Sequence, residues 1–236
     1  MDKIRKAFPS FVTSLNMVCG VCASVLALQG DFRLATFLVI LGAVFDFCDG
    51  FVARLLKATS EFGKQMDSLS DLISFGFAPS AMLYSLVVSN GIFDKYSALF
   101  VLLIAVFSGL RLAKFNVDTE QTVEFKGLPT PASALFIISV CYYCFANPDG
   151  QIAHILASKY AVVLIVAFVC VMMVVNMRLF SMKIKSLKLN AIIWQLILVA
   201  GLVVFVVCFG VLGLAFTMVF YIILSIIRNV LNKNKK

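Results

Sequence analysis

Eight apolar stretches, of 18 to 28 residues each, follow one another along this chain. An α-helix needs about 20 mostly apolar residues to cross the hydrocarbon core of a bilayer. The sequence is 62% hydrophobic and only 14% charged, with a mean hydropathy of +1.03. It therefore predicts an all-α polytopic membrane protein with about eight transmembrane helices. The predicted spans are 10–29, 33–56, 62–89, 96–115, 130–147, 159–178, 190–208 and 211–230.

The lysines and arginines predict how these spans are oriented. Three of the 20 basic residues, namely Arg33, Lys95 and Lys159, fall in the odd-numbered connections. The others lie in the N-terminal segment, the even-numbered connections with their flanks, and the tail. Because cytoplasmic loops are enriched in Lys and Arg, we expect both termini on the cytoplasmic side of the inner membrane. The net charge of +8 then favours anionic membrane lipids, and no motif indicates nucleic-acid binding.

Four aspartates stand out within the second and third apolar stretches. On helices they would form two polar stripes because residues three or four apart share a face. The stripes are Asp46, Asp49 and Arg54 on one helix and Gly63, Asp67 and Asp71 on the next. A break at 57–60 predicts a short turn between the two helices, at the cytoplasmic side.

Converging carboxylates repel one another unless a cation lies between them. Mg²⁺ and Mn²⁺ prefer oxygen ligands and also bind phosphate oxygens. Ionised groups in a membrane are costly and mark function by default. The stripes therefore predict a membrane-embedded metal site that handles a diphosphate. The alternative is structural, with Arg54, Lys57 and Lys64 neutralising the acids in a cytoplasmic vestibule.

The same residues resemble a family signature. The pattern Asp46-x-x-Asp49-Gly50-x-x-Ala53-Arg54, eight further residues and Gly63-x-x-x-Asp67-x-x-x-Asp71 is similar to that of the CDP-alcohol phosphotransferases. These integral membrane enzymes move a phosphatidyl or similar group from a CDP-linked donor to an alcohol. The resemblance implies a six-helix core, two bound Mg²⁺ or Mn²⁺ ions and a homodimer.

The resemblance also implies a role for each position of the signature. Asp46, Asp49 and Asp67 would hold the ions that bind the donor's diphosphate. Asp71 would complete the second ion's site and act as general base on the acceptor hydroxyl. The nucleotide pocket would be formed by Gly50, Ala53, Arg54 and Gly63, together with Thr13 and Asn16 of the first span. For Thr13, a hydrogen bond to a carbonyl of its own helix is an equal alternative.

Two later stretches bear on the acceptor. The segments 108–116 (SGLRLAKFN) and 125–132 (FKGLPTPA) resemble the corresponding parts of membrane-embedded phosphatidylserine synthases, although Lys114 stands where that group has arginine. The resemblance implies CDP-diacylglycerol as donor and L-serine as acceptor. An amino acid needs a cation for its carboxylate and an oxygen for its ammonium group. The candidate acceptor-binding residues are Arg111, Lys114, Asn116 and Lys126, with Ser133 as a further helper.

Several alternatives stay open. Lys114 and Lys126 fit ordinary positive-inside loop charge equally well. Another acceptor, such as glycerol 3-phosphate or inositol phosphate, would use the same chemistry, but the loop 111–126 mixes bases with acids instead of offering a basic pocket for a second phosphate. A divalent-cation transporter would also carry membrane acids, although along a path through several spans.

The predicted organisation has three parts. Residues 1–9 form a basic segment that would lie on the lipid headgroups. Residues 10–178 form the catalytic transmembrane core. Residues 179–236 add a C-terminal helix pair and a basic tail.

Overall fold

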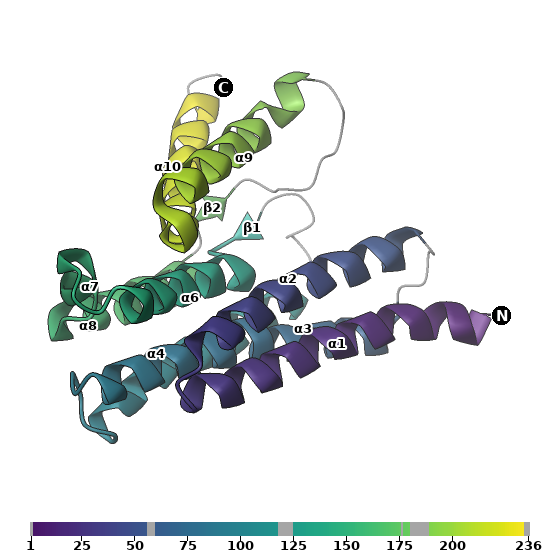
Figure 1. The fold of residues 1–236 in the computed structure, drawn as a ribbon. Helices are drawn as coiled ribbons and strands as arrows, with labels where there is room; N and C mark the ends of the chain where they lie inside the picture. The colour runs from purple at the N-terminus through teal and green to yellow at the C-terminus, as the bar shows by residue number, and fades with distance from the viewer. Residues whose placement is uncertain (1, 56–59, 118–124, 176, 180–188, 234–236) are drawn as a thin grey trace.

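The computed structural model describes residues 2–55, 60–117, 125–175, 177–179 and 189–233, and the described part is almost entirely helical (Figure 1). Two two-residue strands are its only extended elements. In chain order the elements are α1 (Asp2–Leu28), α2 (Phe32–Leu55), α3 (Glu61–Asp71), the π-helix η1 (Leu72–Phe77), α4 (Ala78–Ser89), the 3₁₀-helix η2 (Ser97–Leu102), α5 (Leu103–Val117), β1 (Phe125–Lys126), α6 (Thr130–Ala146), α7 (Gln151–Leu156), α8 (Lys159–Val174), β2 (Arg178–Leu179), α9 (Leu189–Phe209), the 3₁₀-helix η3 (Gly210–Leu212) and α10 (Gly213–Lys233).

An apolar helix occupies each of the eight predicted spans, so the all-α polytopic fold is confirmed. Five helical stretches of the described chain are long and apolar enough to cross a membrane, and α6 and α8 are shorter apolar helices. The five are 9–28, 32–53, 61–89, 97–117 and 193–231, the last of which contains both α9 and α10. The 21 residues of α9 correspond to about 31 Å of helix at 1.5 Å per residue, enough for one crossing.

Three details differ from the sequence prediction. The sixth span ends at Val174 and not at residue 178, because Arg178 pairs with Lys126 in the β1–β2 ladder. The short helix α7, between α6 and α8, was not expected. Residues 2–9 continue directly into the first span as one helix.

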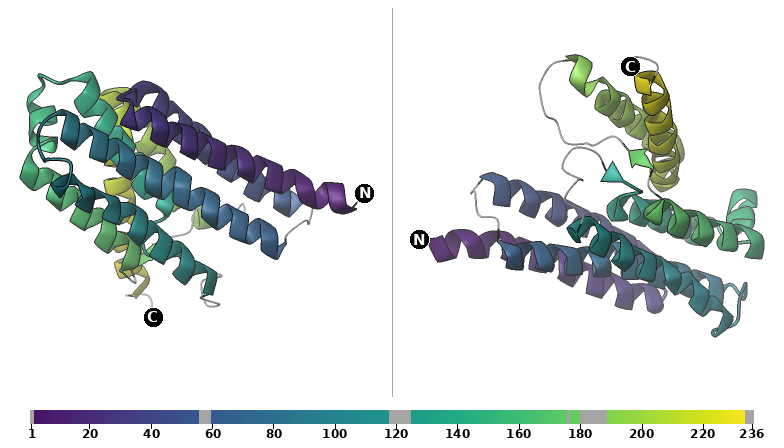
Figure 2. Two further views of the ribbon diagram at one scale, coloured as in Figure 1. Left: turned by 90° about the horizontal axis from the view of Figure 1, so that it is seen from below. Right: turned by 180° about the vertical axis from the view of Figure 1, so that it is seen from behind.

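Helix α1 packs against four other elements of the bundle. It lies along α2 and also contacts α3, η1 and α4, while α6 covers α2 and α4 (Figures 1 and 2). Small residues allow the close approach of α1 and α2, since Ala23, Ala27 and Ala35 are fully buried. This matches the way helices associate in membranes, where small side chains let backbones come together. Large apolar side chains such as Phe37, Phe47 and Phe62 are exposed on the outside, as lipid contact requires.

The third span contains an irregular segment. The π-helix η1 follows Asp71 directly and joins α3 to α4. It passes close to two neighbours: Ser74 of η1 crosses α1 at Gly20, and Gly76 of η1 crosses α5 at Ser108. π-Helical turns are rare and occur often at functional sites. Here the π-turn begins one residue after the last aspartate of the cluster.

We expect Gly20→Ala to destabilise this crossing. A Cβ at residue 20 would lie 2.6 Å from the Cα atom of Ser74, and a backbone atom cannot rotate away. Overpacking of this kind costs about 1–3 kcal/mol. Thermal unfolding in detergent should show a lower midpoint for this variant. Gly109→Ala is the matched control, because its Cβ would meet only Leu72, at 3.6 Å; equal midpoints for the two variants would contradict the prediction.

Helices α9 and α10 form an antiparallel hairpin. The chain reverses at Gly210, whose φ of 58° lies in the left-handed region that glycine adopts without strain. Aromatic contacts close the hairpin, with the ring of Phe205 tilted against that of Phe216 and edge-on to that of Phe220. The pair stands at an angle to the main bundle (Figures 1 and 2). It is joined to the bundle mainly where α10 and η3 contact α6 and α10 contacts β2.

Candidate active site

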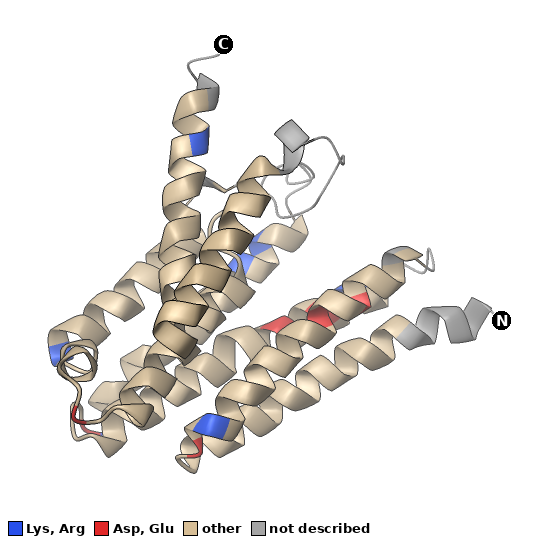
Figure 3. Cartoon of the chain, turned by 45° about the horizontal axis from the view of Figure 1, so that its top comes forward, with Lys and Arg blue, Asp and Glu red and all other residues tan. Residues whose placement is uncertain are grey.

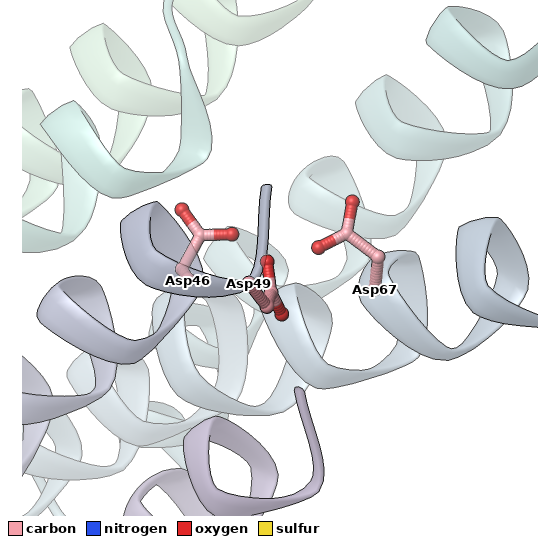
Figure 4. A group of neighbouring side chains, drawn as sticks. All are labelled: Asp46, Asp49 and Asp67. Carbon is pink, nitrogen blue, oxygen red and sulfur yellow. The ribbon is translucent and has the colours of Figure 1, made fainter. Parts of the chain in front are cut away.

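Asp46, Asp49 and Asp67 point toward one another from two helices (Figure 4). One carboxylate oxygen of each lies within 4.8 Å of those of the other two. Two oxygens on opposite sides of a Mg²⁺ ion are about 4.2 Å apart, since each Mg²⁺–oxygen bond is about 2.1 Å. The observed spacing therefore fits a shared divalent ion after small side-chain rotations. The sequence prediction that the two stripes face each other agrees with this geometry.

The way the helices pack creates room for these carboxylates. Helix α1 packs against both α2 and α3. Helix α2 contacts the third span chiefly farther along, at η1 and α4. The two aspartate-bearing helices therefore diverge toward the end where the N-terminus lies. Figure 3 shows the acidic residues of these helices together, with most of each helix free of charge.

Two of the carboxylates have oxygens that the described residues leave unpaired. Within the described part of the chain, Asp49 Oδ2 and Asp71 Oδ1 are buried without a hydrogen-bond partner. A buried carboxylate oxygen without a donor or cation is strongly unfavourable. The cluster offers carboxylate oxygens as ligands, and two of these oxygens are unpaired. Hard divalent cations prefer such ligands. Asp71 lies beside Asp46 and Asp67, with Arg111 as its cationic neighbour.

One candidate of the salt-bridge alternative has another partner in the structure. Lys64 donates from Nζ to the backbone oxygen of Asn116, at 3.3 Å. The side chain of Arg54 and the whole of Lys57 lie outside the described residues.

Helix α1 is fastened to the third span beside the carboxylates. Ser70 Oγ donates to the carbonyl of Thr13 at 3.1 Å, and Ser74 Oγ donates to that of Asn16 at 2.8 Å. Thr13 is buried next to Asp49. Its hydroxyl also donates to Pro9 O at 3.0 Å, which is the bond within its own helix that the sequence left open. Ser70 and Ser74 are four residues apart on the third span. Their two hydrogen bonds hold the part of α1 that carries Thr13 and Asn16 beside the carboxylates.

Asn16 lies deeper than expected for a residue in contact with a nucleotide. Its side chain is fully buried where α1 meets α2, with Oδ1 against Gly42. Neither its Oδ1 nor its Nδ2 has a hydrogen-bond partner among the described residues.

The predicted nucleotide-pocket residues differ in their surroundings. Gly50 is exposed, and a Cβ there would have no neighbour within 4 Å, so the space beside it is open. Ala53 is half-buried on the same helix. Gly63 has a local role, because its N–H donates to Ser60 Oγ and caps α3 at 3.0 Å. A Cβ at Gly63 would come within 3.1 Å of that hydroxyl.

The candidate acceptor-binding residues also differ in their surroundings. Arg111 is 8% exposed and donates from Nη1 to Thr130 Oγ1 at 3.3 Å. Its Nε is buried and has no partner in the described structure. Asn116 instead donates from Nδ2 to Ser68 Oγ at 2.8 Å, which ties the end of α5 to α3. Lys114 is exposed, and the side chain of Lys126 lies outside the described residues.

The hydroxyl of Ser133 is used within its own helix. It is fully buried and donates to Thr130 O at 2.8 Å. The segment before Ser133 forms a turn, as its prolines predict. Two hydrogen bonds hold this turn in place, because the N–H groups of Gly127 and Leu128 donate to Met177 O and Met172 O.

Sequence reasoning missed several residues around the site. Thr130, which orients Arg111, gave no separate signal within the proline-rich turn. Ser70 and Ser74 could have been found from their spacing of four on the face next to Asp67 and Asp71. On α10, Thr217, Tyr221, Ser225 and Arg228 form a polar stripe in an otherwise apolar helix.

Comparison with known proteins agrees with this geometry. A sequence profile described as CDP-alcohol phosphatidyltransferase matches residues 6–234. A CDP-diacylglycerol–serine O-phosphatidyltransferase of Helicobacter pylori is 36% identical over 133 residues, which are 56% of this chain and 55% of that protein. An archaetidylserine synthase of Methanothermobacter thermautotrophicus is 40% identical over 135 residues, covering 56% and 57%.

A CDP-diacylglycerol–serine O-phosphatidyltransferase of Bacillus subtilis is 32% identical over 134 residues, which are 57% of this chain and 75% of that protein. The matched part of the chain thus spans about half the length of the first two relatives. The profile match extends over nearly all the described helices, including both that carry the aspartates. The chain therefore belongs to the CDP-alcohol phosphatidyltransferase family.

Proposed function

We propose that this protein transfers the phosphatidyl group of CDP-diacylglycerol to L-serine, giving phosphatidylserine and CMP. The observation that carries the proposal is the convergence of Asp46, Asp49 and Asp67 from two helices of a chain in this family. The relatives supply the choice of serine, because the names of all three refer to serine or to a serine lipid.

The residues of the site would divide the reaction among them. Asp46, Asp49 and Asp67 would hold two Mg²⁺ or Mn²⁺ ions, which when bound would stabilise charge on the diphosphate and on the departing CMP. Asp71 would accept the proton of the serine hydroxyl while that oxygen attacks the phosphorus bearing the diacylglycerol. The new oxygen–phosphorus bond forms as the bond from that phosphorus to CMP breaks. Arg111 would bind the serine carboxylate.

The donor would lie along α2. The open space beside Gly50 would admit the cytidine close to the helix backbone. The small side chain of Ala53 would leave the same face of α2 open. Thr13 lies beside Asp49 and would complete this side of the pocket. Arg54 would add a cation near the phosphates. The roles of Asn16 and Gly63 would be indirect, because Asn16 is enclosed between helices and Gly63 makes room for the cap of α3.

We also propose that the site faces the cytoplasm from the inner membrane. Among the described side chains, Lys64, Arg111, Lys114 and Arg228 belong to the end of the bundle where the aspartates lie, whereas Arg33, Lys95 and Lys159 belong to the other end. The positive-inside rule favours a cytoplasmic position for the first group. In this arrangement residues 10–178 would be the catalytic core, 1–9 an interfacial segment and 179–236 an appended helix pair. The family resemblance further suggests a homodimer.

Two other functions are less well supported. Transport of a divalent cation would place acids along a path, whereas the described aspartates of α2 and α3 are gathered at one end of the bundle. A phosphorylated acceptor would need further cations beside Arg111. The described neighbours of Arg111 are Thr130, Asp71 and Tyr221, and the further cation Arg228 lies near Tyr221.

Purified protein with CDP-diacylglycerol and radiolabelled L-serine tests the proposal. We expect Mg²⁺- or Mn²⁺-dependent labelling of lipid and an equal release of CMP, both abolished by EDTA and restored by added ion. Parallel reactions would offer glycerol 3-phosphate or inositol phosphate. Asp31→Asn is a suitable control variant, since Asp31 caps α2 at the opposite end and asparagine also caps helices. Faster transfer to either phosphorylated acceptor than to serine would contradict the proposal.

A further inference from the structure

The last helix carries a polar stripe that faces the bundle. Thr217, Tyr221, Ser225 and Arg228 follow one another at steps of four, four and three, so they share one face of α10. Tyr221 is 6% exposed and Ser225 is 1% exposed. The opposite face, with Val219, Ile223 and Ile226, is exposed and apolar.

Tyr221 differs from the other hydroxyl residues of this stripe. Thr217 Oγ1 donates to Gly213 O at 2.7 Å, and Ser225 Oγ donates to Tyr221 O at 2.8 Å. Both hydroxyls are therefore used within α10 itself. The phenol of a tyrosine extends too far to bond its own helix backbone, and a buried tyrosine hydroxyl usually finds a polar partner. The hydroxyl of Tyr221 therefore reaches toward groups on other helices.

The contacts of α10 direct Tyr221 toward the candidate acceptor residues. Helix α10 packs against α6 and β2. The first residue of α6, Thr130, accepts the hydrogen bond from Arg111 Nη1. The ionisable groups that interact with the Arg111 guanidinium are Asp71 and Tyr221, and Tyr221 also interacts with Arg228. Four elements thus meet here, with Asp71 from α3, Arg111 from α5, Thr130 from α6 and Tyr221 from α10.

One donor of this group has no partner among the residues that the structure describes. Arg111 is more than nine-tenths buried, and its Nε is unpaired within the described chain. A buried guanidinium with an unused N–H is suited to a carboxylate or a phosphate, which accept from it in a fixed geometry. A phenol beside it can donate to the same anion.

We propose that Tyr221 is part of the acceptor site and that its hydroxyl donates to the carboxylate that Arg111 binds. The appended helix pair would then take part in selecting an amino-acid acceptor. This inference rests on the proposed function, in which the acceptor is serine. It also gives α10 a role in acceptor recognition that the six-helix core by itself would not supply.

Kinetics of Tyr221→Phe test the inference. The ring that packs on the bundle is kept and only the hydroxyl is removed. A hydrogen bond to a charged group is worth roughly a tenfold effect or more, so we expect KM for L-serine to rise about tenfold. KM for CDP-diacylglycerol and kcat should stay within about twofold of the wild-type values. Tyr84→Phe is the matched control, because its hydroxyl bonds Lys95 O at the far end of the bundle.

L-Serinamide separates recognition from a general structural effect. It keeps the hydroxyl and the amine but lacks the carboxylate. Loss of the Tyr221 hydroxyl should reduce kcat/KM for serine and leave that for serinamide nearly unchanged. An equal loss for both acceptors, a change confined to the donor, or no change would overturn the inference. Absence of serine transfer by the wild-type protein would instead overturn the proposed function.

Discussion

Replacing Asp71 by asparagine is expected to lower the rate of phosphatidyl transfer by about 10²–10⁴-fold, the range by which a positioned general base contributes. The amide cannot accept the proton of the acceptor hydroxyl, but it has nearly the same shape as the carboxylate. The oxygens within 4.8 Å of one another come from Asp46, Asp49 and Asp67 and are unchanged, and the side-chain oxygen of asparagine can still bind the second ion. Donor binding should therefore persist. Single-turnover CMP release and equilibrium binding of CDP-diacylglycerol would measure the two effects separately.

The position of Asp71 explains why its loss should affect turnover more than binding. It ends α3 directly before the π-helix, and one of its oxygens is buried and unpaired in the described structure. It lies between the other aspartates and Arg111. Asp31→Asn again provides the control, as the same chemical change at the opposite end of the bundle. Full activity of Asp71→Asn would exclude this residue as the base.

Asp67→Ala is expected to abolish metal-dependent activity. Asp46 and Asp49 both project from α2, so Asp67 is the one member of the three-aspartate group that the third span supplies. Without it, Asp71 would be the one aspartate of the cluster left on the third span, and the two ions would lose the ligand that they share with α3. A metal ion stabilises transition-state charge by several kcal/mol, which corresponds to about a 10³-fold loss in rate. CMP release across a titration of Mg²⁺ and Mn²⁺ would measure this loss.

A second measurement tests the same variant without relying on activity. A ligand that binds only the folded protein raises its stability by RT ln(1 + [L]/Kd). The wild-type unfolding midpoint should therefore rise with added Mn²⁺, and that of Asp67→Ala should not. Glu61→Ala is the matched control, since Glu61 is an exposed acid in the first turn of the same helix. A midpoint that still rises with Mn²⁺ in Asp67→Ala would place the ion elsewhere.

The sequence by itself determined the helices and the identity of the acidic cluster. Long apolar stretches can satisfy their backbone hydrogen bonds in a membrane only as helices, which is why every predicted span contains a helix. Asp46 and Asp49 on one face, and Asp67 and Asp71 on another, follow from the helical period alone. The period also made it reasonable to expect the two faces to meet.

Only the tertiary structure decided which polar residues reach the site. Helical spacing places Asn116 and Ser133 near the acceptor region, but Asn116 bonds Ser68, and Ser133 bonds Thr130 O. Tyr221 lies 110 residues from Arg111 in the chain, and no local pattern could pair them. The direction of a side chain depends on which neighbouring helix buries it. That choice arises from packing between distant segments, such as α10 on α6, and not from the periodicity of either helix.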